Sequence, residues 1–132
     1  MSVLARLRGP SQLEVEKLAE EIRAEGTRLA WNTNLIPKKW RDNFSKPLCS
    51  LLHGLYCKVV RTNKIRTTTE ELVVKRKKEA QEAIDILEEI YELINYIATT
   101  LPVDWNKFNT ILTLMEKERK KLENWRDSTK LI

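Results

Sequence analysis

The chain has 132 residues, enough to bury one hydrophobic core without disulfide or metal cross-links. Its composition, 42% hydrophobic and 33% charged with only 3 Gly and 4 Pro, suits a helical domain and excludes disorder and membrane insertion. The net charge of +5 favours an anionic partner, either nucleic acid or an acidic protein.

The first two predicted helices cover residues 11–32 and 45–62. The first begins at Ser11-Gln12-Leu13-Glu14, a capping box in which the hydroxyl and the carboxylate bind free backbone N–H groups. After a connector that contains Pro37, Ser45 is the expected cap of the second helix, and Pro47 fits its first turn.

The third and fourth predicted helices cover residues 69–99 and 104–127. Thr68 and Glu71 offer a second capping box, and Asp104 is the expected cap of the fourth helix. Apolar residues recur with helical spacing in all four segments, and the connections are short. We therefore expect an all-α fold, with residues 1–132 forming a single domain that is an antiparallel up-down-up-down four-helix bundle.

Catalytic groups are scarce in this sequence. His53 is its one histidine, and no glycine-rich phosphate loop or nucleophile–base pair is visible. Cys49, His53 and Cys57 stand four residues apart, but together they span about 12 Å of helix and cannot chelate one ion. We expect no catalytic residue, no metal and no cofactor, and hence a binding protein rather than an enzyme.

The acidic and aromatic residues are interpreted as structural. The carboxylates of residues 79–92 mostly avoid the heptad positions and are expected to form a solvated face. Trp105 and Trp125 lie in phase with the apolar stripe of the fourth helix and are expected in the core, whereas Trp31 and Trp40 are expected to close the bundle beside the first connector.

Basic residues are concentrated in one part of the chain. From residue 58 to residue 78 there are eight bases and two acids, so this stretch carries +6 (8 − 2). Antiparallel helices would bring it next to the end of the fourth helix and to Arg6 and Arg8, which gives one cationic end suited to a phosphate backbone. The nucleic-acid-binding residues predicted from this pattern are Arg61, Lys64, Arg66, Lys75, Arg76, Lys78, Arg119 and Lys120.

The second helix has more apolar surface than one bundle needs. Leu48, Leu52 and Leu55 mark the arc that faces the core, while other apolar residues lie about a quarter turn away. The simplest cover is another copy of the chain, so we predict a homo-oligomer. Its interface is expected to contain Cys49, His53, Tyr56 and Val60.

With these features, residues 28–127 resemble the accessory variability determinant (Avd) proteins of diversity-generating retroelements. More distantly, they resemble the four-helix proteins encoded by intervening sequences in ribosomal RNA genes. The resemblance is carried by Leu35-Ile36-Pro37-Lys38-Lys39, by the leucine-rich second helix, and by two later patterns: Ala80, Ala83 and Leu87, then Ile111, Leu112, Leu122 and Trp125.

The resemblance to the Avd family implies a basic, non-catalytic protein that forms a pentameric barrel of bundles. It implies two partners, the reverse transcriptase of the element and RNA, with DNA as a further candidate, in adenine-directed mutagenic copying of a template repeat. Two features depart from the family pattern: the acidic run of residues 79–92 and a first helix that is less apolar.

Two other functions remain open at this stage. One is a protein–protein adaptor whose basic end binds an acidic partner. The other is a four-helix protein encoded by an intervening sequence in a ribosomal RNA gene, which has no role in a retroelement. The first ten residues lack the apolar segment of a signal peptide, so the expected location is the cytoplasm, without membrane attachment.

Overall fold

The structure is a computed structural model that describes residues 10–132, with side chains from Leu13 onward. Its four long helices are α1 (Pro10–Ala30), α2 (Lys46–Asn63), α3 (Glu70–Thr100) and α4 (Asn109–Ser128). Shorter helical turns, η2 (Lys38–Trp40), η3 (Arg41–Ser45) and η4 (Trp105–Phe108), precede α2 and α4. Within residues 10–132 there is no strand, which confirms the all-helical prediction for this part of the chain.

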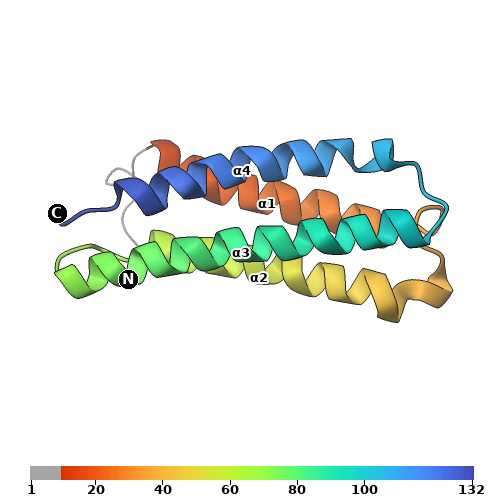
Figure 1. The fold of residues 1–132 in the computed structure, drawn as a ribbon, viewed down its shortest axis with the longest axis horizontal. Helices are drawn as coiled ribbons and strands as arrows, with labels where there is room; N and C mark the ends of the chain where they lie inside the picture. The colour runs from red at the N-terminus through yellow and green to blue at the C-terminus, as the bar shows by residue number, and fades with distance from the viewer. Residues whose placement is uncertain (1–9) are drawn as a thin grey trace.

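The four helices lie side by side, and each packs against its neighbours in the chain, while α4 also packs against α1 (Figure 1). In Figure 1 the ribbon of α1 runs from left to right, α2 returns, α3 runs to the right again and α4 returns. The start of α1, the end of α2, the start of α3 and the end of α4 therefore share one end, here named the α2–α3 end. The other end, which holds the α1–α2 and α3–α4 connectors, is named the connector end.

The core forms where the apolar stripes of the helices meet. From Ala80 onward, most buried positions of α3 follow alternating steps of three and four residues, the pattern of bundle packing, and Val73 lies one seven-residue repeat earlier: Val73, Ala80, Ala83, Leu87, Ile90, Ile94 and Ile97. Each fully buried large side chain stabilises the fold by about 1.5–3 kcal/mol. Gly26 in α1 is also buried, and a Cβ there would overlap the side chain of Leu52, so glycine permits the close approach of α1 to α2.

The first connector differs from the expectation at Ser45. Its backbone is helical and its hydroxyl makes no cap hydrogen bond, because the chain enters α2 directly from the π-helical turn η3. Instead, the buried Ser45 hydroxyl donates to the carbonyl of Ala30 at 2.6 Å and ties the connector to the end of α1. The prediction of a Ser45 cap was therefore wrong.

The other caps show smaller differences. Thr69, rather than Thr68, caps α3, and its hydroxyl accepts from the backbone N–H of Leu72 at 3.2 Å. Asp104 does act as a cap, accepting from Asn106 N at 3.0 Å, but the helix it begins is η4, and α4 starts only at Asn109. The capping box at Ser11 lies outside the described side chains.

The carboxylates of α3 do not form a uniformly solvated face. Glu79 is buried, only 8% exposed, where α3 meets α2. The ammonium of Lys58 lies 3.8 Å from Glu79 and 3.0 Å from Glu82. The prediction was thus wrong for Glu79, which belongs to a half-buried ion-pair cluster between two helices.

Candidate nucleic-acid interface

The turn between α2 and α3 is held by the C-terminal tail of the chain. Its buried residue Thr67 donates its hydroxyl to the carbonyl of Lys130 at 2.8 Å and accepts the backbone N–H of Ile132 at its own carbonyl, 3.0 Å away. Lys64 closes the last turn of α2, where its N–H meets the carbonyls of Arg61 and Thr62. The turn is therefore an ordered support for the cations that it carries.

Five of the predicted binding residues are exposed on this turn and on the adjoining helix ends: Arg61, Lys64, Arg66, Lys75 and Lys78. Within residues 10–132, no carboxylate lies within 4.0 Å of any of their charged groups. Unpaired cations of one sign repel one another, and a bound polyanion relieves that repulsion.

Arg76 does not belong to this exposed set. Its guanidinium carbon lies 4.9 Å from the centre of the Trp125 ring, and Trp125 is itself buried, as the sequence predicted. Its Nε is buried without a hydrogen-bond partner in the part of the chain that the structure describes, and burial lowers the pKa of the guanidinium. A nucleic-acid-binding residue is expected at the surface, but Arg76 packs between α3 and α4.

The cations of α4 are mostly paired. Arg119 is 2.8 Å from Glu88 of α3 and 3.9 Å from Glu123, and Lys121 is 3.1 Å from Glu14 of α1. Lys120, also on α4, is exposed and has no ion-pair partner among the described residues. Arg6 and Arg8, which were predicted to join the cationic end, lie outside the described residues. The structure thus brings together the cations of α2 and α3, while α4 adds few cations that have no ion-pair partner among the described residues.

The predicted oligomer residues form one strip along α2, at successive spacings of four, three and four. Cys49, Tyr56 and Val60 are half-buried, and His53 is exposed. Part of the strip is covered by α1, since the Arg23 guanidinium lies 4.0 Å from the centre of the Tyr56 ring and 3.4 Å from His53 Nδ1. The apolar surplus of α2 is therefore smaller than expected.

The cysteines of α2 are free thiols in different surroundings. Burial raises the pKa of Cys49, although hydrogen bonds with Trp31 and Thr27 act in the opposite direction. Cys57 Sγ lies 3.5 Å from His53 Nε2. Among the described residues, no cluster of three or more His, Cys, Asp or Glu side chains is placed to hold a metal ion.

Glu118 is a buried acid on α4. It is 0% exposed in α4, and neither carboxylate oxygen has a hydrogen-bond partner within the described chain. Burial raises its pKa to about 9, although nearby Lys121 lowers it. A signal was present, because Glu118 continues the three–four spacing of Ile111, Met115 and Leu122.

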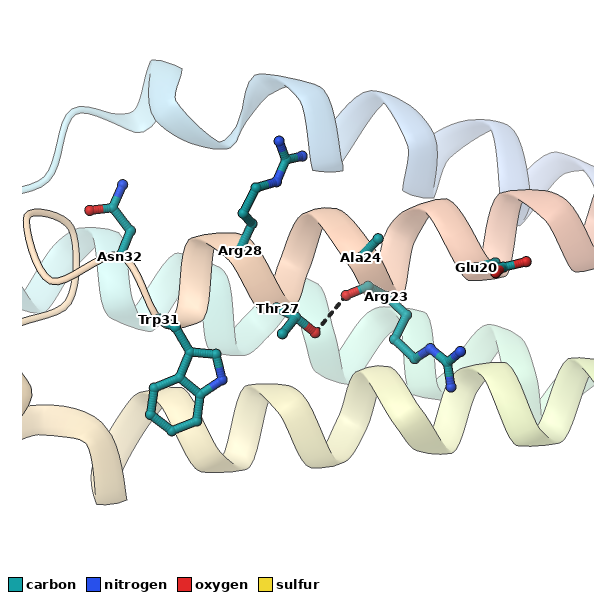
Figure 2. Close-up of a pocket in the computed structure, with 7 residues that line it drawn as sticks. All are labelled: Glu20, Arg23, Ala24, Thr27, Arg28, Trp31 and Asn32. Carbon is teal, nitrogen blue, oxygen red and sulfur yellow. Dashed lines mark hydrogen bonds between the residues drawn. The ribbon is translucent and has the colours of Figure 1, made fainter.

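A shallow hollow of about 760 Å³ lies on the surface of α1, toward the connector end. Figure 2 shows Arg23 and the Trp31 indole extending from α1 toward α2, and Arg28 extending toward α4. The lining is completed by Glu20, Ala24, Thr27 and Asn32. Trp31 is 41% exposed and so does not close the bundle as expected, whereas Trp40 is half-buried against the core.

A second hollow, of about 350 Å³, lies between α3 and α4. Trp105 and Tyr91 line it and meet edge to face, with ring centres 6.4 Å apart, and the Arg119–Glu88 ion pair stands beside them. Trp105 is 36% exposed, so its predicted place in the core was wrong.

Comparison with known proteins gives no relative: no family model, no curated protein and no solved structure matches the chain. In the described part of the chain, every helix is too short or too polar to cross a bilayer.

Proposed function

We propose that this chain is a non-catalytic subunit that binds nucleic acid through the cations of its α2–α3 end. The observation that carries the proposal is the set of five exposed cations (Arg61, Lys64, Arg66, Lys75 and Lys78) that have no ion-pair partner within residues 10–132. Each phosphate contact that such a cation makes releases a counterion from the nucleic acid, which favours binding at low salt. Contacts of this kind recognise the backbone rather than the base sequence.

The more specific proposal is an accessory subunit of a diversity-generating retroelement, bound to the reverse transcriptase and to template-repeat RNA. It rests on the resemblance of residues 28–127 to the Avd family. In this proposal the chain is an up-down-up-down bundle that assembles into a homo-oligomer, with five copies as the family suggests. The strip of Cys49, His53, Tyr56 and Val60 supports a contact between copies, because these residues share one side of α2 and keep part of their surface exposed.

The test of nucleic-acid binding is the double charge reversal Lys75→Glu/Lys78→Glu, measured by fluorescence anisotropy with labelled RNA. Since both lysines are exposed, the variant should fold like the wild type and bind RNA at least about tenfold more weakly. The single variants Lys75→Glu and Lys107→Glu form a matched pair, because Lys107 is also exposed but lies on η4, in the α3–α4 connector next to the acidic residue Asp104. Only the first should lose affinity.

Equal losses in the matched pair would show a general effect of net charge and would contradict the proposed site. A wild-type protein that binds no RNA would favour the protein–protein adaptor. Light scattering tests the assembly separately, since a monomer at micromolar concentration would contradict the proposed oligomer. A neighbouring reverse-transcriptase gene and a repeat that differs at adenines are expected for a retroelement subunit.

A further inference from the structure

Two tryptophans are exposed at the connector end, and their surroundings have opposite charge. Trp31, 41% exposed, directly follows α1 at the start of the α1–α2 connector. Trp105, 36% exposed, opens η4 next to Asp104 and packs on Tyr91, in a part of the chain rich in acids. From residue 83 to residue 116 there are six acids and one base, so that stretch carries −5 (1 − 6).

The Trp31 indole is held on one face by an arginine. The Arg41 guanidinium carbon lies 4.9 Å from the centre of its ring. The indole also forms a wall of the α1 hollow, on the same side of α1 as Thr27 (Figure 2). A fixed, partly exposed ring costs little conformational entropy when a ligand stacks on it.

The connector that follows Trp31 carries an excess of cations. From residue 28 to residue 46 there are five bases and one acid, a charge of +4 (5 − 1). Arg28 is paired with Glu25, and Lys46 lies 2.7 Å from Asp42. The others, Lys38, Lys39 and Arg41, have no ion-pair partner among residues 10–132.

We infer that Trp31 is a stacking platform for an unpaired base of single-stranded nucleic acid, with Arg41 on one face of its ring. Lys38 and Lys39, which are exposed in the connector that follows Trp31, would contact the flanking phosphates. An aromatic ring bordered by cations is the arrangement that proteins use to bind single strands. Thr27 and Asn32 also line the hollow and offer hydrogen-bonding groups to a base that stacks on Trp31. This inference rests on the proposed nucleic-acid binding and adds a second contact at the opposite end of the bundle.

The test compares Trp31→Ala, Trp31→Phe and Trp105→Ala by fluorescence anisotropy with labelled oligouridylate and with an RNA duplex of equal length. Trp31→Ala should bind the single strand about 5- to 100-fold more weakly, the range found when one stacking ring is removed. Trp31→Phe should keep most of the affinity. Trp105→Ala, which removes a tryptophan of similar exposure in acidic surroundings, should bind like the wild type, and affinity for the duplex should not change.

Several results would overturn the inference. One is wild-type affinity in Trp31→Ala, and another is an equal loss for single strand and duplex. A third is a change of oligomeric mass in light scattering with RNA affinity intact, which would make Trp31 part of a contact between copies. If Lys75→Glu/Lys78→Glu weakens RNA binding while Trp31→Ala does not, the stacking platform alone is wrong. If the wild type binds no RNA, the proposed function is wrong as well.

Discussion

The turn between α2 and α3 and the last turns of α4 both carry many lysines and arginines, but they differ in what surrounds each charge. On α4, Arg119 and Lys121 meet carboxylates that α3 and α1 supply, Glu88 and Glu14. On the α2–α3 side, Lys64 and Arg66 lie on a turn at the end of the bundle, where no neighbouring helix presents an acid within 4.0 Å among residues 10–132.

A count of charges along the chain cannot separate these two regions, because the neutralising acids come from helices distant in sequence. The difference leads to a division of roles. Charges on α4 should contribute mainly to stability, and charges at the α2–α3 end mainly to binding.

The largest effect is expected at Glu118. Its pKa of about 9 in the folded protein lies above the ordinary value of 4.5, so the folded state keeps a proton that the unfolded state releases. The free energy of unfolding should therefore fall as pH rises from about 4.5 to about 9, and at pH 7 the loss is about 3 kcal/mol. Glu118→Leu should recover about this amount in thermal denaturation.

The pH dependence of the stability gain shows whether the ionisation of Glu118 is its cause. The stability gained by Glu118→Leu should be small at pH 5 and larger at pH 8, because only the wild type loses stability over this range. Glu118→Gln should share the flatter pH profile, since an amide does not titrate. A gain that is the same at both pH values would show that packing, and not ionisation, is responsible.

A smaller loss is expected at Arg76. Replacement by alanine removes the guanidinium from the face of Trp125 and should destabilise the bundle by about 1–2 kcal/mol. RNA affinity should change far less than in Lys75→Glu/Lys78→Glu, because Arg76 is packed between helices. Unchanged stability together with a large loss of RNA affinity would show that Arg76 contributes to binding and not to the stability of the bundle.

The smallest effect is expected at Lys121. Its ion pair with Glu14 is partly exposed, and such pairs contribute less than about 1 kcal/mol. Lys121→Ala should therefore lower the melting temperature slightly and leave RNA affinity within about twofold of the wild type. A tenfold loss of RNA affinity would show that α4 also contacts the ligand.

Much of the fold was predictable because helix formation depends on local spacing. The apolar repeat indicated four helices, and Asp104 was identified as a cap. Ser45 was not predictable in the same way, since its hydroxyl is used in a contact with the distant carbonyl of Ala30. A tertiary contact of this kind leaves no mark in the spacing of neighbouring residues.

The candidate site was predictable only in part. Exposure of Lys64 and Arg66 follows from their place on a turn, but the pairing of Arg119 with Glu88 depends on how α3 and α4 are aligned. The burial of two charged residues had a visible signal in the sequence. Arg76 lies between Val73 and Ala80 in the core repeat of α3, and Glu118 lies between Met115 and Leu122 in that of α4. A charged residue at a position that the helical spacing assigns to the core should be predicted as buried.

The most direct test of the central claim is the salt dependence of RNA binding for the wild type and for Lys75→Ala/Lys78→Ala. If the unpaired cations contact phosphates, the logarithm of the wild-type affinity falls steeply and linearly with the logarithm of the salt concentration. The double variant should show a slope smaller in magnitude by about 2, or about 1 for each lysine removed. Equal slopes for the two proteins, or a wild-type slope near zero, would contradict the claim that the α2–α3 end binds a polyanion.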